Sequence, residues 1–181
     1  MVRAPNLRVA TPADDETIDA LMKDSIAAIF PHFYDAVQTA SAVRYIADVD
    51  RTLIADETYF ALESGAEIVG CGGWSRRNLL YTGSGDSADD GRLLDPATEP
   101  ARVRAMFVRA EWTRQGLGRR ILEECEAAAR REGFRQLALM ATLPGVPLYL
   151  AYGFRSLAEV EITMPDGVTL ACVSMEKPIE G

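Results

Sequence analysis

The sequence predicts an α/β (α+β) fold with a mixed, mostly antiparallel central sheet of about seven strands flanked by helices. Three observations support this prediction. Strand-like and helix-like segments alternate along the 181 residues, which is typical of helices packed on a sheet. Residues 58–74 and 154–176 each hold two strand-like segments joined by a short turn, as in antiparallel hairpins. The longest helix-like segment is apolar on one face only, which fits packing against a sheet.

The first half of the chain predicts one strand, two helices and a hairpin. Thr11-Pro12-Ala13-Asp14 favours a helix start, because it supplies a cap residue, a proline in the first turn and an acid near the positive helix end. The aromatic cluster Phe30–Tyr34 then interrupts the helical spacing. The expected elements are a strand at 7–10, a helix from 11, a helix at 39–47, and strands at 58–63 and 68–74.

The second half predicts one long connection, four strands and two helices. Residues 78–100 are rich in glycine, aspartate and proline, and we expect a long loop there whose role the sequence does not specify. The expected elements are a strand at 102–108, a helix ending at Gly133, a strand at 136–141, a short helix at 147–152, and strands at 154–164 and 168–176. We interpret residues 1–181 as a single domain.

Composition excludes several classes of function. The net charge of −8 argues against a nucleic-acid binder, which needs a basic face. No apolar run reaches the roughly 18 residues that a membrane span needs, and residues 1–11 do not resemble a signal peptide. We therefore expect no nucleic-acid partner, no membrane partner and a cytoplasmic location. The single histidine, His32, and the absence of a C-x-x-C pair predict no metal site.

The start of the helix after residue 112 has an unusual composition. Gln115-Gly116-Leu117-Gly118-Arg119 places glycines and arginines where a helix has unpaired N–H groups and partial positive charge. A strand followed by a glycine turn and a helix N-terminus is a phosphate cradle, and Arg114 and Arg119 would add charge at its rim. The alternative is an ordinary strand–helix turn. A nucleotide-binding loop is disfavoured, because the Gly-Lys pair and the third glycine are missing.

Two segments resemble the GCN5-related N-acetyltransferase family. The strand, Gly116-x-Gly118 and the following helix are similar to its motif A, with Trp112 at a position that is often aromatic and Thr113 replacing the usual Gln or Arg. "PLYLAYGF" (147–154) is similar to its motif B, with matches at Tyr149, Gly153 and Phe154. Leu148 replaces a phenylalanine, and Pro144 replaces an asparagine that often contacts the coenzyme.

The resemblance implies transfer of an acetyl group from acetyl-coenzyme A, as co-substrate, to a primary amine of a small molecule or peptide. Tyr149 then corresponds to the general acid and lies against the coenzyme. The pantetheine arm is expected along Met106, Phe107 and Val108, as an added strand would lie. The diphosphate is expected at Arg114, Gln115, Gly116, Leu117, Gly118 and Arg119.

The acceptor side is less specified by the sequence. Phe30, Tyr34 and Trp74 are candidate walls of the substrate site, although for each of them a place in the core is the favoured alternative. Gly72 and Gly73 within a strand predict a bulge or a close backbone approach. The general base is either a water or an acid, and the candidate acids are Glu63, Asp95, Glu99 and Glu111. The alternative function is a non-catalytic acyl-coenzyme A-binding domain; a homodimer is a common default.

Overall fold

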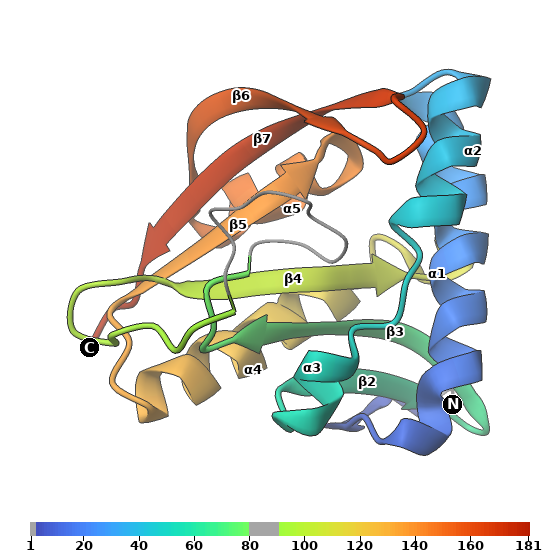
Figure 1. Cartoon of the computed structure of the whole chain (residues 1–181). Helices are drawn as coiled ribbons and strands as arrows, with labels where there is room; N and C mark the ends of the chain where they lie inside the picture. The colour runs from blue at the N-terminus through green and yellow to red at the C-terminus, as the bar shows by residue number, and fades with distance from the viewer. Residues whose placement is uncertain (1–2, 80–90) are drawn as a thin grey trace.

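A seven-stranded sheet runs through the molecule (Figure 1). The structure is a computed structural model, and it describes residues 3–79 and 91–181. The strand order is β1-β2-β3-β4-β5-β7-β6. The strands are β1 (Asn6–Val9), β2 (Tyr59–Ser64), β3 (Glu67–Ser75), β4 (Ala101–Val108), β5 (Gln136–Thr142), β6 (Arg155–Thr163) and β7 (Thr169–Pro178).

All neighbouring strands pair antiparallel except β4 and β5, which are parallel. This confirms the predicted mixed, mostly antiparallel sheet of seven strands. The β4–β5 contact is also the shortest of the ladders, since only Ala101↔Leu137 and Arg102↔Ala138 are in register. The sheet therefore consists of two antiparallel parts joined at a narrow seam.

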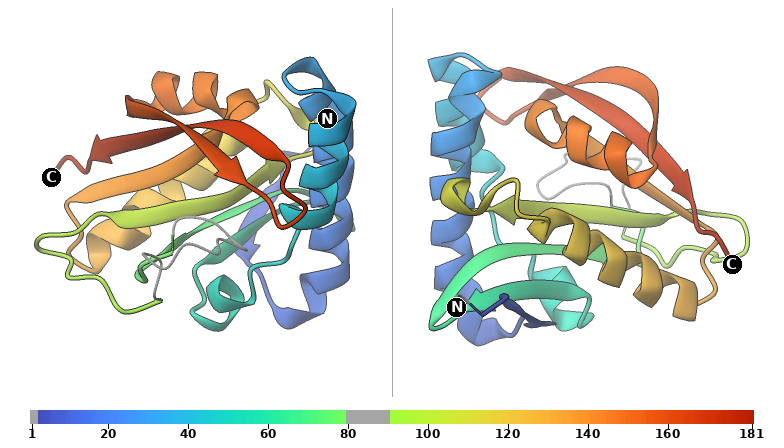
Figure 2. Two further views of the ribbon diagram at one scale, coloured as in Figure 1. Left: turned by 45° about the horizontal axis from the view of Figure 1, so that its top comes forward. Right: turned by 180° about the vertical axis from the view of Figure 1, so that it is seen from behind.

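Helices cover both faces of the sheet (Figure 2). Helices α1 and α4 both contact β3 and β4, and the view from behind shows α4 and α5 together on the face opposite α1. The α-helices in the described residues are α1 (Asp15–Ile29), α2 (Ala36–Tyr45), α3 (Arg51–Ala55), α4 (Leu117–Arg131) and α5 (Val146–Tyr152). Short 3-10 turns are η1 (Pro12–Asp14), η2 (Phe30–His32), η3 (Ala110–Trp112) and η4 (Leu143–Gly145).

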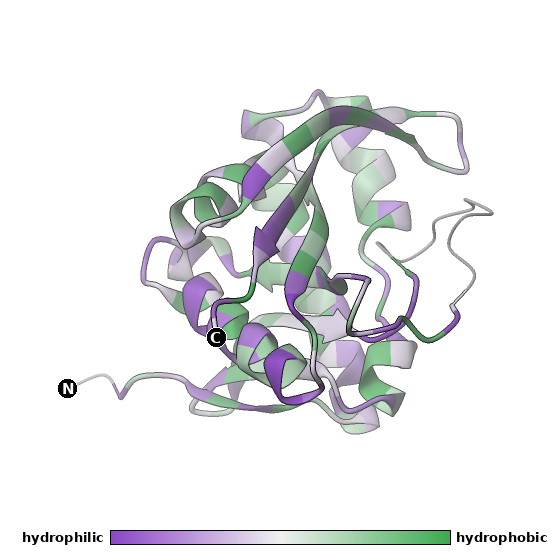
Figure 3. Ribbon diagram, turned by 90° about the vertical axis from the view of Figure 1, so that its left-hand side faces the viewer, coloured by the Kyte–Doolittle hydropathy of each residue, from purple (hydrophilic) through white to green (hydrophobic). Residues whose placement is uncertain are grey.

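Each face has its own hydrophobic core. The first core joins α1, α2 and α3 to the sheet through residues such as Ile18, Met22 and Leu53. The second core joins α4 and α5 to the other face through residues such as Ile121 and Leu122. Figure 3 colours the residues by hydropathy and shows hydrophilic and hydrophobic residues alternating around the helices, as expected for helices with one buried face.

Some boundaries differ from the sequence prediction for local reasons. Helix α2 begins at Ala36 instead of Thr39, because the Asp35 carboxylate accepts a hydrogen bond from Gln38 N (2.8 Å) and Asp35 N donates one to Gln38 Oε1 (3.0 Å). Helix α3 was not predicted; its five residues start after Asp50, whose carboxylate accepts from Leu53 N at 3.1 Å.

The connection predicted as a long loop at 78–100 is only partly described. Residues 80–90 lie outside the described residues. The remainder includes a bridge between Arg77 and Leu93 and a buried Leu94, so its ends are attached to the body of the protein. No helix long and apolar enough to cross a membrane occurs within residues 3–79 and 91–181.

Candidate functional site

The seam between β4 and β5 is where the candidate site lies. After Arg102 and Ala138 the two strands no longer pair, so they diverge over the rest of their length. A β-bulge in β4 accompanies this divergence. The register against β3 shifts so that the segment between Arg104 and Phe107 opposes the shorter segment between Gly73 and Cys71. A bulge bends its strand and strengthens the local twist.

The bulge forces an unusual backbone conformation at Ala105, whose φ is 58°. A non-glycine residue in this region is strained unless its surroundings hold it. The Tyr59 hydroxyl donates a hydrogen bond to Ala105 O at 3.3 Å and lies 3.3 Å from Cys71 Sγ. Tyr59 is fully buried, and burial raises the pKa of its phenol, so it stays a donor. This contact stabilises the bulge carbonyl.

Gly72 makes room for the bulge of β4, and Gly73 makes room for the start of β2 on the other side of β3. A Cβ on Gly72 would lie 2.2 Å from Met106 Sδ, and one on Gly73 would lie 2.4 Å from Thr58 O. Both distances are shorter than the 3.0 Å below which real Cβ atoms essentially never approach another atom. The close approach and the bulge expected at these adjacent glycines are therefore both present.

A cavity of about 90 Å³ occupies the diverging seam. Its walls come from both cores: Phe107, Met140 and Ile162 belong to the first, whereas Met106 and Tyr149 belong to the second. The cavity therefore passes between the strands and connects the two faces of the sheet. The lining residues are Ile46, Asp48, Val103, Arg104, Ala105, Met106, Phe107, Met140, Thr142, Tyr149, Ile162 and Cys172.

Tyr149 is the buried phenol at the α5 side of this cavity. It is 8% exposed, and its ring packs edge-on against Phe154 with centroids 5.7 Å apart. Gly145 leaves space for the ring, since a Cβ there would lie 2.8 Å from Tyr149 Cε2. Burial raises the pKa of Tyr149 well above its usual value. Among the described residues its hydroxyl has no hydrogen-bond partner, so the proton is available to a group in the cavity.

Helix α5 is fixed to α4 by a half-buried polar cluster. Glu126 accepts hydrogen bonds from Tyr152 Oη (2.5 Å) and Lys177 Nζ (2.8 Å). Glu126 is only 7% exposed, so these two bonds offset the cost of burying its charge. They join α4, α5 and β7, and thereby fix the helix that carries Tyr149.

The N-terminus of α4 presents a row of unpaired amides. Within the described part of the chain, the N–H groups of residues 115–119 donate to no backbone or side-chain acceptor; the first helical bond runs from Arg120 N to Gly116 O at 3.1 Å. Gly116 is left-handed (φ 79°), and Arg114 is also left-handed (φ 65°). Left-handed residues placed among right-handed ones orient successive N–H groups toward a common point, as in anion-binding nests.

The two motif glycines serve different purposes. A Cβ on Gly116 would meet nothing within 4 Å, so its role is the positive φ and an open approach to the amides. A Cβ on Gly118 would lie 2.7 Å from Leu148 Cδ2, so Gly118 allows α4 and α5 to pack closely. The expectation that both glycines admit an anion is therefore supported by the geometry at Gly116 alone.

Residues 55–156, more than half of the chain, match the family described as the acetyltransferase (GNAT) domain. The chain belongs to the GNAT family. No curated protein gives a significant match. A GNAT protein from Rhodopseudomonas palustris has a similar structure, with a TM-score of 0.71 and 17% identity over 98% of each chain.

Two further solved structures are similar to this GNAT domain. The PaiA N-acetyltransferase of Thermoplasma acidophilum, in complex with coenzyme A, has a TM-score of 0.67 and 14% identity over 97% of this chain and 99% of its own. The YncA putative acetyltransferase of Salmonella typhimurium, with acetyl-coenzyme A, has a TM-score of 0.64 and 17% identity over 98% and 95%. At these identities the likeness shows the fold, and the family supports acetyl transfer in general terms.

The residues expected to form the acceptor walls lie elsewhere in this GNAT domain. Trp74 is 1% exposed and packs edge-on against Phe134 (5.8 Å) in the second core. Phe30 is buried beside Tyr34 in the first core. The Tyr34 hydroxyl donates to Ala171 O (2.7 Å) and accepts from Leu143 N (2.8 Å), so it ties η2 to β7 and η4. None of the three lines the cavity, because each is needed for packing.

The acids considered as general bases also lie away from the cavity lining. Glu63 pairs with Arg8, and Glu99 pairs with Arg92, whereas Asp95 accepts from the Thr98 hydroxyl. Glu111 is exposed in η3. The cavity instead has Asp48 at its edge, a residue that sequence reasoning missed. Asp48 comes from an irregular linker with no periodicity, so no local signal could have indicated it.

Proposed function

We propose that the protein transfers an acetyl group from acetyl-coenzyme A directly to a primary amine of a small molecule or peptide. The observation that carries this proposal is the phenol of Tyr149, which is buried at a cavity between diverging strands and has no hydrogen-bond partner among the described residues. Membership of the GNAT family and the two coenzyme-bound relatives of the same fold support acetyl-coenzyme A as the donor.

The coenzyme diphosphate would bind at the start of α4. The unpaired amides of residues 115–119 and the positive end of a 15-residue helix favour a polyanion there. Arg114 and Arg119 are exposed beside it, although Arg119 also pairs with Glu123 at 3.1 Å. The Thr113 hydroxyl donates to Ala110 O, so this replacement of the family's usual residue stabilises the turn instead.

The pantetheine arm would lie along the unpaired edge of β4. Met106 and Phe107 line the cavity there, and an extended amide chain can pair with a free strand edge. Val108 does not line the cavity, and its carbonyl already accepts a hydrogen bond from Ser25 Oγ at 2.8 Å. We therefore restrict the proposed pantetheine contacts to Met106 and Phe107.

Tyr149 would act as the general acid. As the amine nitrogen bonds to the acetyl carbon and the carbon–sulfur bond breaks, the leaving thiolate takes the phenol proton. A raised pKa keeps Tyr149 protonated at neutral pH, and a thiolate of a lower-pKa thiol can still be protonated inside a buried site. The proton that the amine nitrogen loses on acylation passes through water and restores the Tyr149 phenol, which closes the cycle.

Thiol release from acetyl-coenzyme A over a panel of primary amines tests the proposal. We expect coenzyme A to appear only when an amine is present, and calorimetry to show binding of coenzyme A alone. Gly116→Val should weaken that binding by at least tenfold while the circular dichroism spectrum is kept, because the side chain disfavours the left-handed turn that aims the amides. Coenzyme binding without thiol release for every amine would instead indicate a non-catalytic binding domain.

A further inference from the structure

The cavity has an exposed end and a buried end with different chemistry. Tyr149 lies at the buried end, whereas Asp48 is exposed on the linker between α2 and α3. The linker at Asp48 is therefore a part of the cavity wall that an acceptor can reach from solvent. The chemistry of the walls between these two ends determines what kind of amine can be held.

The walls on the acceptor side are mostly apolar. Ile46, Phe107, Met140 and Ile162 line the cavity and all pack against the first core. Thr142 shares a face of β5 with Met140, because residues two apart in a strand point the same way. These walls fit an aliphatic or aromatic body better than a heavily hydroxylated one such as an amino sugar.

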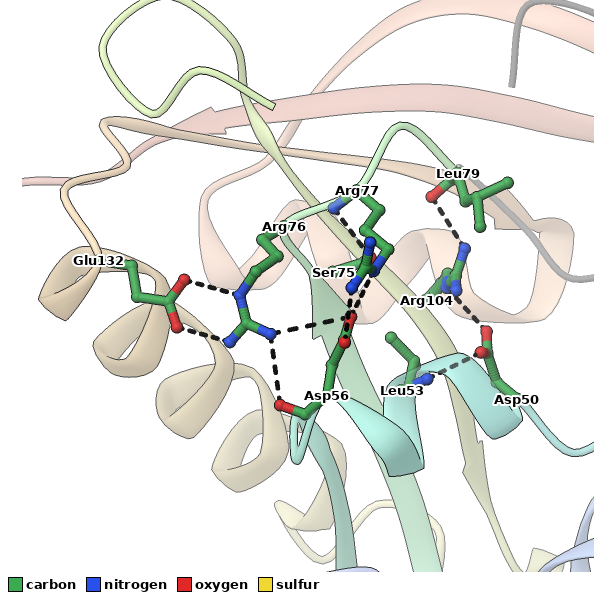
Figure 4. A network of polar contacts seen from close by, with 9 residues as sticks. All are labelled: Asp50, Leu53, Asp56, Ser75, Arg76, Arg77, Leu79, Arg104 and Glu132. Atoms are coloured by element: carbon green, nitrogen blue, oxygen red, sulfur yellow. Dashed lines mark hydrogen bonds and ion pairs between the residues drawn. The ribbon is translucent and has the colours of Figure 1, made fainter. Parts of the chain in front are cut away.

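The positive charge at the cavity is already neutralised. Arg104 is 6% exposed, and its Nε lies 2.8 Å from Asp50 Oδ2; its Nη1 donates to Leu79 O at 3.1 Å (Figure 4). Asp50 also caps α3 through Leu53 N, so this pair is built into the fold. An acceptor carboxylate would therefore find its cationic partner engaged.

The negative charge at the cavity is not neutralised. Among the described residues, the Asp48 carboxylate has neither an ion pair nor a hydrogen bond, and its N–H donates locally to Ile46 O at 2.8 Å. Nearby acids on other elements are paired: Asp50 with Arg104, and Asp56 with Arg77 (Figure 4). Among the described lining residues, Asp48 is thus the one acid, and its charge is uncompensated on a protein whose net charge is −8.

We propose that the acceptor is an aliphatic diamine or polyamine, whose reacting amine lies beside Tyr149 while a second, cationic nitrogen binds Asp48. This inference depends on the proposed acetyltransferase function and names its substrate class. The apolar walls would contact the methylene chain, and Asp48 would select for the second charge. Amino acids should be poor acceptors, since their carboxylate would lie among apolar walls and a neutralised arginine.

Three amines of equal chain length isolate this selectivity. Cadaverine has both nitrogens, n-pentylamine lacks the second one, and free L-lysine adds a carboxylate to the cadaverine skeleton. We expect kcat/KM for cadaverine to exceed that for n-pentylamine by about fivefold, which is what an exposed ion pair provides. The difference should reside in KM, and L-lysine should be the poorest acceptor.

Variants of Asp48 assign the preference to that carboxylate. In Asp48→Asn the ratio of kcat/KM for cadaverine to kcat/KM for n-pentylamine should fall to about one. In Asp48→Lys this ratio should fall below one. Glu159→Gln is the matched control, because Glu159 is an exposed acid on β6 outside the cavity lining. It should keep the wild-type ratio.

The outcomes separate this inference from the transferase proposal. An unchanged ratio in Asp48→Asn, or a preference for L-lysine over cadaverine, would overturn the diamine inference while thiol release still supports transfer. No thiol release from any of the three amines, in protein that binds coenzyme A, would overturn the transferase proposal and this inference with it.

Discussion

Tyr149 is the residue whose chemistry can be tested most directly. Its ring packs against Phe154 and the residue lines the cavity, so Tyr149→Phe should remove the proton without moving the ring. We expect kcat to fall by about 10²-fold or more, the usual contribution of a general acid. Coenzyme A affinity, measured by calorimetry, should stay within twofold. A kcat within twofold of wild type would remove Tyr149 from the chemistry.

Tyr59 is expected to affect the site through the backbone. Tyr59→Phe deletes the donor to Ala105 O and leaves that carbonyl without it at a strained position. We expect a loss of about 1 kcal/mol in the free energy of unfolding, measured in urea, because a part-buried acceptor loses its stronger donor and keeps only Cys71 Sγ at 3.8 Å. Coenzyme A binding should also weaken, since β4 aligns the pantetheine arm.

Tyr45→Phe is the matched control for Tyr59. Tyr45 is half-buried in α2 with Arg44 over its ring, and its hydroxyl has no hydrogen bond in the described part of the chain. The Tyr45→Phe variant should have the stability and the coenzyme A affinity of the wild type. Equal effects of the two substitutions would show that the bulge does not depend on the Tyr59 hydroxyl.

At the level of single residues, the sequence indicates the site residues whose roles depend on the backbone conformation of a short segment. Gly116 and Tyr149 lie in short motifs, so their spacing alone indicates the cradle and the phenol. Asp48 and Cys172 line the same cavity from segments more than a hundred residues apart in the chain. Only the pairing of distant strands and the packing of the helices brings them together, and no local pattern encodes that.

The attachment of α5 to α4 is a property of two elements. Glu126 and Lys177 have side chains that are 10% and 14% exposed, so replacing one partner leaves a poorly solvated charge. We expect Glu126→Gln to reduce the free energy of unfolding by about 2–3 kcal/mol, below the range for fully buried pairs because water still reaches the edge of this cluster. Urea unfolding with an unchanged m value would measure it.

Glu123→Gln is the matched control on the same helix. Glu123 pairs with Arg119 one turn away, but both side chains are more than half exposed. Its loss should change the free energy of unfolding by no more than about 0.5 kcal/mol. If Glu126→Gln were equally mild, the Glu126 cluster would not hold α5 in place.

The predicted elements were most accurate where a long periodic pattern exists. The strands of both hairpins and helix α4 were placed within a few residues, because period two and period 3.6 repeat several times in them. Helix α3 has only five residues and was missed, since a single turn gives no periodicity and depends on the Asp50 cap. Predicted aromatic walls such as Trp74 are core, because an apolar residue fits either role equally well.

At the scale of the whole molecule, the two antiparallel parts of the sheet are joined by only two residue pairs at β4 and β5. The cavity lies at this seam and not in either core. If β4 and β5 paired along their whole length, the sheet would be continuous there and would leave no cavity between its two faces. Under the proposed function, the narrow seam is therefore the feature of the fold that would let a donor on one face meet an acceptor from the other.

The stability of the whole molecule should depend on pH through the Arg8–Asp14 pair. Asp14 is 8% exposed, and its carboxylate accepts from Arg8 Nη1 at 2.7 Å and Nη2 at 2.8 Å. The Arg8 hydrogen bonds lower the pKa of Asp14 to about 2, from 3.8. Because the folded-state pKa is depressed, this contribution is complete above about pH 5 and is lost as the pH falls toward 2.

Asp14→Asn tests this dependence, since the amide keeps the size of the side chain and can still accept from Thr11 N, as Asp14 does at 2.8 Å. We expect the variant to be less stable than wild type by about 1–2 kcal/mol at pH 7, with the difference decreasing to near zero at pH 2. Urea unfolding at a series of pH values would measure both proteins. A difference that stayed constant from pH 7 to pH 2 would show that the substitution acts through packing, and not through the titration of the carboxylate.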